Sequence, residues 1–264
     1  MLLSCQWPLL ESLTLCAGRR DDAQASLIFK ADWPLLQTLR LPYNCLMHLE
    51  GVEHNRWPQL ELVCLVDNPV SNTGLQRLVS AQWPKLTSLY LNDNSAHAWR
   101  PLTWHQLIEA NWPMLSTLDL GRNGIKAAMM KNIVAAQFSS IRTLKLSNNS
   151  LDSVAIGHLV KGPWLQLCHL ELNRALCGSI ADCLGLLSTG DWLQLEFLWL
   201  GANGVDATAL PALAKSRWPS LYHVNLKYNH LSRDDFKLMG GDAACDEPRD
   251  ICRKFWPKMH SVDY

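Results

Sequence analysis

Residues 57–83 read WPQLELVCLVDNPVSNTGLQRLVSAQW, and this stretch shows one complete unit of a pattern that recurs along the 264-residue chain. Its Trp-Pro marker returns, intact or in a close substitute, after steps of 26, 24, 26, 29, 26, 26, 28, 26 and 38 residues. The markers are Trp7, Trp33, Trp57, Trp83, Trp112, Phe138, Trp164, Trp192, Trp218 and Trp256. A nearly constant period of this length predicts a solenoid of stacked units.

Each unit reads as a short strand followed by a helix. Apolar residues stand three, six and eight positions after the marker, as in Leu86, Leu89 and Leu91. Apolar side chains on alternate positions predict a half-buried strand. The remainder of the unit is helical in pattern, for example at residues 125–136, where Ile125 and Ile133 share one face.

The Trp-Pro marker is assigned a structural role. Proline disfavours helical geometry in the residue before it and lacks a backbone donor, so we expect the marker to stop each helix and turn the chain towards the next strand. The regular recurrence of the aromatic ring predicts stacking between units. The tryptophans assigned to this role are Trp33, Trp57, Trp83, Trp112 and Trp218.

An asparagine stands three residues beyond the last apolar position of the strand in seven of the ten units. Its amide carries both donors and an acceptor, so it can satisfy backbone groups that the turn leaves unpaired. These asparagines are Asn44, Asn68, Asn94, Asn123, Asn149, Asn203 and Asn229.

The pattern Leu65-x-x-Asn68-x-Val70-x-x-x-Gly74-x-x-x-Leu78-x-x-Ala81 resembles the helical, intracellular leucine-rich repeat of ribonuclease-inhibitor-like proteins. The resemblance covers nearly the whole chain. It implies an α/β leucine-rich-repeat solenoid, shaped as a horseshoe or arc, with a concave parallel β-sheet and convex helices. We therefore expect a single domain of about ten repeats over residues 1–264, and the sequence leaves open whether the first and last repeats are complete.

Composition excludes several classes of function. Lys+Arg and Asp+Glu are equal at 24 each and form no basic run, which argues against nucleic acid as a partner. The nine cysteines are scattered and never spaced as CxxC, so we expect neither a zinc site nor a disulfide framework. No long apolar window predicts a signal peptide or membrane span, and we expect an intracellular, cytoplasmic protein without a cofactor.

Side chains that alternate with the buried leucines should face solvent on the concave sheet. The predicted central column is Thr14, Arg40, Cys64, Tyr90, Asp119, Lys145, Glu171, Trp199, Asn225 and Asp263. Together with the flanking columns it gives two apolar groups, which are typical of binding anchors. The early group is Tyr43, Leu62, Cys64, Val66 and Tyr90, and the late group is Phe197, Trp199, His223 and Tyr228.

Each group has an alternative interpretation. A loop or the C-terminal segment could shield Phe197 and Trp199, while Leu62 and Cys64 could be ordinary strand formers. The charged band between the groups contains Asp119, Arg122, Lys145, Glu171 and Arg174, and alternating signs favour pairing between strands over a role in steering a partner.

Three units depart from the pattern. The fourth carries His97, Trp99, Trp104 and His105 in an insertion, whose spacing matches no metal site. The seventh has Ala175 in place of the asparagine, which predicts a local irregularity with Asn173 as the substitute. The segment 240–252 is glycine-bearing and acidic, and it predicts a surface loop in which free thiols are favoured over a Cys245–Cys252 pair.

These observations favour a non-catalytic protein–protein interaction module: an adaptor, a receptor or a subunit of a larger assembly, with the partner on the concave sheet. Absence of a phosphate-binding glycine loop or an assignable nucleophile–base spacing argues against an enzyme. The alternatives are a leucine-rich-repeat subunit of an enzyme complex, such as a ubiquitin ligase or a GTPase regulator, and a scaffold that makes its contacts through convex residues such as Lys131 and Lys161. The partner itself stays unidentified.

Overall fold

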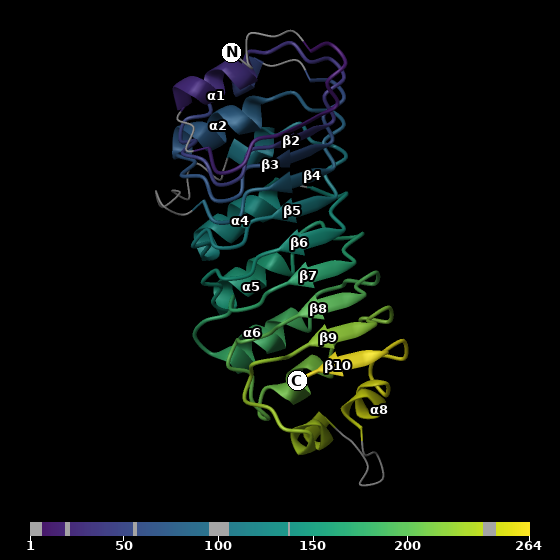
Figure 1. Cartoon of the computed structure of the whole chain (residues 1–264). Helices are drawn as coiled ribbons and strands as arrows, with labels where there is room; N and C mark the ends of the chain where they lie inside the picture. Colours follow the sequence, from purple (N-terminus) through teal and green to yellow (C-terminus); the bar gives the residue numbers. More distant parts are fainter. Residues whose placement is uncertain (1–6, 19–21, 55–56, 95–105, 137, 240–246) are drawn as a thin grey trace.

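The structure, a computed structural model, describes residues 7–18, 22–54, 57–94, 106–136, 138–239 and 247–264. Within these residues ten three-residue strands form one parallel sheet, and each strand pairs with the next in the sequence (Figure 1). The strands are β1 (Ser12–Thr14), β2 (Thr38–Arg40), β3 (Leu62–Cys64), β4 (Ser88–Tyr90), β5 (Thr117–Asp119), β6 (Thr143–Lys145), β7 (His169–Glu171), β8 (Phe197–Trp199), β9 (His223–Asn225) and β10 (Ser261–Asp263).

Helices follow most strands, and α1, α2, α4, α5 and α6 lie to one side of the sheet, whereas α8 lies beside the last strand (Figure 1). The α-helices are α1 (Asp22–Phe29), α2 (Asn72–Ser80), α4 (Ala127–Ala135), α5 (Ser153–Leu159), α6 (Ile180–Leu187), α7 (Leu210–Leu213) and α8 (Pro248–Cys252). Short 3₁₀ helices take the equivalent place in other units: η2 (Val52–His54), η4 (Gln106–Glu109) and η5 (Asp234–Met239).

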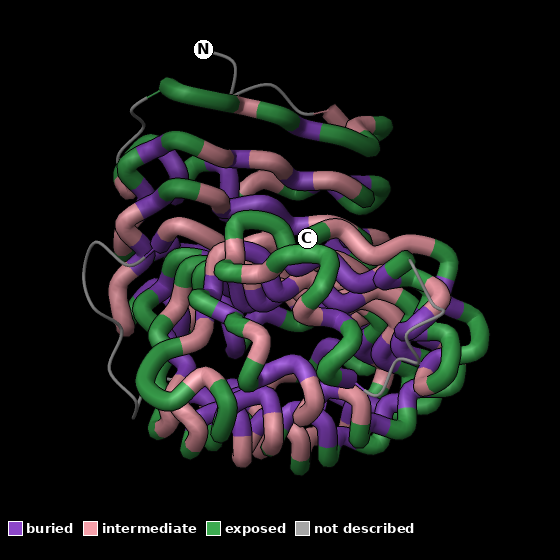
Figure 2. The backbone as a smooth tube through the Cα atoms, turned by 90° about the horizontal axis from the view of Figure 1, so that it is seen from below, coloured by how far each residue is buried: buried purple, intermediate pink, exposed green. Residues whose placement is uncertain are grey.

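One continuous apolar core runs between the sheet and the helices. The middle residue of each strand points into it, so that Leu89, Leu144 and Leu198 are completely buried. Figure 2 shows the buried positions inside the stack and the exposed ones mainly on its outer loops. A single unit has no second apolar layer of its own, so each unit depends on its neighbours for burial.

The strand register confirms the predicted central column. Its ten members are Cα partners across successive strands, from Thr14 opposite Arg40 to Asn225 opposite Asp263. Two of them are nevertheless buried, Cys64 and Asn225. Cys64 lies between the longer side chains of Arg40 and Tyr90, which explains why a small side chain there loses its contact with water.

The aromatic markers stack as predicted. Trp33 and Trp57 have ring centroids 6.0 Å apart with an interplanar angle of 13°, and Trp192 and Trp218 are 5.8 Å apart at 18°. Indole groups also donate hydrogen bonds, as from Trp57 Nε1 to Ala31 O at 3.1 Å. The rings therefore join neighbouring units along one edge of the stack.

The expectation that the marker stops each helix was wrong. Helix α2 ends at Ser80, before Trp83, and α5 ends at Leu159, before Trp164. The marker forms a turn instead, in which the amide three residues on donates to the marker's carbonyl, as from Leu60 N to Trp57 O at 3.1 Å. Proline restricts only the residue directly before it, so its influence does not reach the helix end.

The asparagines perform the predicted task. Asn203 Nδ2 donates to Leu172 O at 2.9 Å and to Leu200 O at 2.8 Å, while its Oδ1 accepts from Ala175 N and Leu176 N at 2.8 and 2.9 Å. Equivalent bonds occur at Asn44, Asn68, Asn94, Asn123, Asn149 and Asn229. Each amide thus connects the turns of neighbouring units.

The residue before each asparagine position has a positive φ. Ala17, Tyr43, Asp67, Asp93, Arg122, Asn148, Arg174, Ala202 and Tyr228 have φ between 50° and 62°. The left-handed region costs a non-glycine residue on the order of 1 kcal/mol. Amides in this column extend the hydrogen bonding between units beyond the strands, as from Arg174 N to Gly201 O at 2.9 Å.

The seventh unit is irregular, as predicted, but by a different mechanism. Leu151 N donates to the backbone carbonyl of Ala175 at 2.8 Å, so this carbonyl takes the place of the side-chain oxygen that an asparagine would supply. Leu151 also forms an isolated bridge with Leu176. The proposed substitute, Asn173, accepts from Gly201 N at 2.7 Å instead. The backbone group next to Ala175 is therefore sufficient for this turn.

Part of the predicted 240–252 loop is a helix, because α8 occupies residues 248–252 and buries Ile251 and Cys252. The thiol of Cys252 is free, and burial raises its pKa to about 12. Residues 240–246, which include Cys245, and the fourth-unit insertion with His97, Trp99, Trp104 and His105 lie outside the described residues.

We expect Asn203→Ala to reduce the free energy of unfolding by about 3 kcal/mol, because it removes four hydrogen bonds that join the turns of two units, including the one that Leu176 N donates. Urea denaturation monitored by tryptophan fluorescence measures the change. Asn111→Ala is the matched control, since Asn111 is exposed and should change stability by no more than about 0.5 kcal/mol. Equal losses in the two variants would contradict the structural role of the asparagine series.

Candidate functional site

Six ring side chains gather on the sheet surface of the last four units. His169 stacks on Phe197 with centroids 5.3 Å apart and on Trp199 at 5.9 Å. His223 lies edge-on to Trp199 at 5.9 Å. The late aromatic cluster, as we call it, comprises His169, Phe197, Trp199, Tyr222, His223 and His260.

The cluster extends beyond the residues that the sequence indicated. The ring centroid of Tyr222 lies 6.0 Å from that of Phe197 and 4.9 Å from that of His260, on which it stacks with an interplanar angle of 6°. Sequence reasoning missed His169, Tyr222 and His260. Aligning the column of Phe197 and His223 would have found His169, because the three are direct register partners, whereas Tyr222 and His260 each stand one residue before a strand.

Neighbouring rings shield Phe197 and Trp199 only in part. Both are half-buried, while Tyr222 is exposed. The indole Nε1 of Trp199 is buried without a hydrogen-bond partner among the described residues. A half-buried ring held on both sides by other rings is a rigid, largely apolar surface, which is the kind of feature that anchors protein interfaces.

Tyr228 does not join this cluster. It is 85% exposed, lies in the positive-φ column at the ends of the strands, and makes no ring contact with the cluster among the described residues. It borders a separate hollow of about 340 Å³, to which Trp199 also contributes. We call this hollow the strand-end groove; Arg122, Glu171, Arg174, Trp199, Lys227 and Tyr228 are among the residues that line it.

The charged band consists mostly of internal pairs, which confirms the pairing interpretation for three of its members. Lys145 Nζ lies 3.5 Å from Glu171 Oε2, and Arg122 Nη1 lies 3.1 Å from Asp93 Oδ2. Asp119 Oδ1 accepts from Gly121 N at 3.0 Å, and burial raises the pKa of this carboxyl. Arg174 is exposed and has no ion pair among the described residues.

The early group is looser. Tyr43 is exposed, whereas Leu62, Val66 and Tyr90 are half-buried. Cys64 is only 6% exposed, so its assignment as a solvent-facing anchor was wrong. The small thiol is covered where larger side chains flank it in the register. Tyr43, Leu62 and Tyr90 stay as untested candidates.

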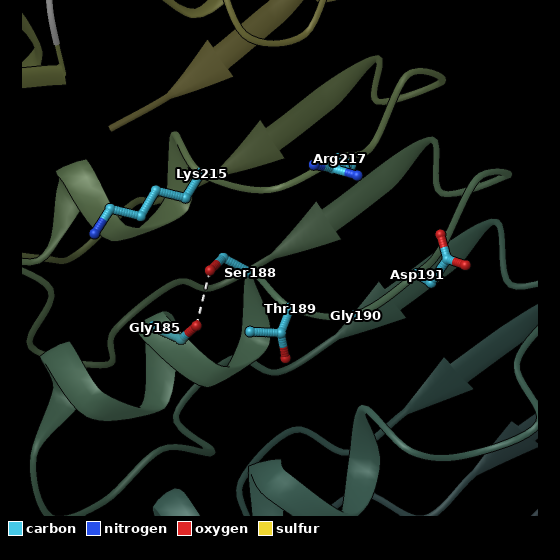
Figure 3. Close-up of a pocket in the computed structure, with 7 residues that line it drawn as sticks. All are labelled: Gly185, Ser188, Thr189, Gly190, Asp191, Lys215 and Arg217. Carbon is cyan, nitrogen blue, oxygen red and sulfur yellow. Dashed lines mark hydrogen bonds between the residues drawn. The ribbon is translucent and has the colours of Figure 1, made fainter.

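A second hollow, of about 480 Å³, lies between the end of α6 and the segment after α7 (Figure 3). Ser188 Oγ donates to Gly185 O at 2.8 Å at the end of α6, and Figure 3 shows the side chains of Lys215 and Arg217 pointing in different directions. None of the described residues that line this hollow is aromatic. Despite its larger volume it offers less for recognition than the strand-end groove, because its charged groups do not converge.

The described residues contain no group of three or more His, Cys, Asp or Glu side chains arranged to hold a metal ion. In the same residues, no helix has the length and apolar character required to cross a bilayer.

Three solved structures resemble the chain over most of its length. InlP of Listeria monocytogenes gives a TM-score of 0.57 at 18% identity over 84% of this chain, and the match spans only 57% of InlP. LegL7 of Legionella pneumophila, a leucine-rich-repeat protein, gives a TM-score of 0.56 at 17% identity, over 96% of this chain and 82% of LegL7.

A chain of the yeast Rad7–Elc1 complex gives a TM-score of 0.51 at 15% identity, over 97% of this chain and 69% of that one. The chain has the leucine-rich-repeat fold. This confirms the predicted fold class, an α/β solenoid with a parallel sheet, and identities this low establish nothing further. No protein-family model and no curated protein sequence matches the chain. Leucine-rich-repeat solenoids commonly mediate protein–protein interaction through extended surfaces.

The late aromatic cluster should make stability depend on pH. Burial lowers the pKa of both His169 and His223, and the charges of Lys145 and Lys227 act in the same direction. The unfolded chain therefore binds protons more tightly, and stability falls as the pH drops below about 6.5, the value for a free histidine. The loss is complete only below the lowered pKa of the folded state.

We expect the double variant His169→Gln/His223→Gln to lose stability less steeply than the natural protein between about pH 7 and pH 5. Urea denaturation at several pH values measures the slope. His230→Gln provides the control, because His230 is exposed and should leave the slope unchanged. An identical slope in the double variant and the natural protein would show that these rings do not carry the effect.

Proposed function

We propose that this protein is a non-catalytic protein–protein interaction module, an adaptor, receptor or subunit of a larger assembly, that binds its partner on the concave sheet. The observation that supports this most directly is the late aromatic cluster. Six rings, each in contact with at least one other, lie on adjacent strands or directly before them and form a largely apolar surface that is rigid before binding, so little side-chain entropy is lost on association. Aromatic residues in such positions are the usual anchors of protein interfaces.

The early group extends the proposed surface. Leu62 and Tyr90 lie several strands away on the same sheet and Tyr43 just beyond the end of β2, so a partner that covers both groups would cross the charged band between them. Because that band is mostly paired internally, it would contribute orientation more than affinity. The yeast neighbour was crystallised as a complex with Elc1, which is compatible with a subunit role for a chain of this fold.

Photo-crosslinking from single positions tests the face that binds. A photoreactive residue is placed at Tyr222 or Tyr90 on the concave side, or at Lys131 or Lys161 outside it, in the full chain expressed in its native cells. We expect the concave positions to link the same protein. Links only from Lys131 and Lys161 would contradict the proposal and favour a scaffold that uses its convex surface.

Substitution then measures the contribution of the rings. Trp199→Ala should weaken the crosslinked complex by about thirtyfold, equivalent to about 2 kcal/mol, as expected for an aromatic anchor. Tyr90→Ala tests the early group separately. Leu165→Ala is the control, because Leu165 is 76% exposed but precedes its strand at the marker turn. Thermal unfolding of each variant distinguishes lost binding from lost folding, and unaltered binding in Trp199→Ala would contradict the proposal.

A further inference from the structure

The strand-end groove lies where two small residues, Gly201 and Ala202, stand between larger side chains in two adjacent columns. Arg174, Ala202 and Tyr228 occupy successive places in the positive-φ column. Gly201 precedes Ala202, and a Cβ at Gly201 would approach Asn173 Oδ1 to 2.9 Å and Lys227 O to 3.2 Å. A Cβ at Gly201 would fit only if the side chain of Asn173 moved, and the hollow opens between Arg174 and Tyr228.

The charges around the groove balance except for one. Arg122 pairs with Asp93 at 3.1 Å, and Lys227 pairs with Asp263 at 3.0 Å. The acidic wall residue, Glu171, has its Oε2 3.5 Å from Lys145 Nζ, and its Oε1 accepts a hydrogen bond from Ser147 Oγ at 2.8 Å.

Arg174 alone among these charged wall residues has no ion pair within the described part of the chain, and it is exposed. The groove thus presents one uncompensated positive charge. A single free guanidinium matches a singly charged carboxylate, because its planar donors can form two parallel hydrogen bonds to the two oxygens. A phosphate would bring nearly two charges and would compete with Asp93 or Asp263 for cations already paired.

The groove is continuous with the late aromatic cluster, since Trp199 belongs to both. We propose that the strand-end groove binds an aspartate or glutamate side chain of the same protein partner that covers the late aromatic cluster, with Arg174 as its ion-pair partner. This inference rests on the proposed function. The partner segment would then present an apolar residue to the cluster and, close to it, an acidic residue to the groove.

Selection from a phage-displayed library of random twelve-residue peptides, with the intact protein as the target, tests both the groove proposal and the proposed function on which it rests. We expect enrichment of peptides in which an acidic residue accompanies an aromatic or aliphatic one. Selection against Arg174→Glu should replace the acidic preference with a basic one. Arg142→Gln, which removes an exposed cation at the other end of the strands, should leave the preference unchanged.

A selected peptide then measures how much the acidic side chain contributes to binding. Glu→Gln in the peptide should weaken binding to the natural protein by roughly tenfold to a hundredfold, the range for hydrogen bonds to a charged group. The same change should have little effect on binding to Arg174→Gln. Phosphoserine in place of the glutamate should bind no more tightly than glutamate, and tighter binding would overturn the assignment to a carboxylate.

The two proposals fail in different ways. Peptides that require Trp199 but show no acidic preference, or keep it in Arg174→Glu, would overturn the groove assignment and leave the concave interaction surface intact. Failure to recover any peptide that depends on Trp199 or Arg174 would contradict both. Arg174 is exposed and already has a positive φ, so its replacement by another non-glycine residue adds no backbone strain that could mimic lost binding.

Discussion

The hydrogen-bond network of the asparagine series is the constraint on which the rest of the structure depends. In each regular unit the amide donates to carbonyls of its own strand end and of the preceding unit, and its oxygen accepts from amides of that unit, as at Asn149. These backbone groups are buried and would otherwise lack partners, at a cost of about 1–3 kcal/mol each. Satisfying them outweighs the conformational cost of the positive φ in the residue before the asparagine.

That arrangement also explains where variation is tolerated. Positions that face the core or close the turn are mostly leucine-like residues, asparagine and stacked tryptophan, with exceptions such as Ala175 and Phe138. The concave columns and the positive-φ column point outwards and accept almost any side chain, from Arg174 to Ala202 to Tyr228. Because the parallel register holds these columns side by side, residues about 26 positions apart in the sequence become neighbours, as His169 and Phe197 do.

The periodic part of the structure could be predicted from the sequence, because it depends on interactions that repeat with the period. The number of strands, the central column, the tryptophan stacking and the asparagine bonds belong to this part. The burial of Cys64 and the free charge of Arg174 depend on which side chains flank one position or pair around it, and a column alone does not show this. The ends of the helices and the position of α8 within 240–252 depend on local packing, which cannot be predicted from the position of the Trp-Pro marker.

Arg174 and the irregular seventh turn are adjacent in the chain, and the geometry relates them. Ala175 replaces the asparagine, so the backbone carbonyl of Ala175 takes over the bond to Leu151 N that an amide oxygen supplies elsewhere. The side-chain oxygen of Asn173 accepts from Gly201 N at 2.7 Å and lies only 2.9 Å from where a Cβ at Gly201 would stand. The groove beside Arg174 therefore follows from how the seventh and eighth turns meet. A departure from the repeat here changes the shape of the surface while the core beneath it stays regular.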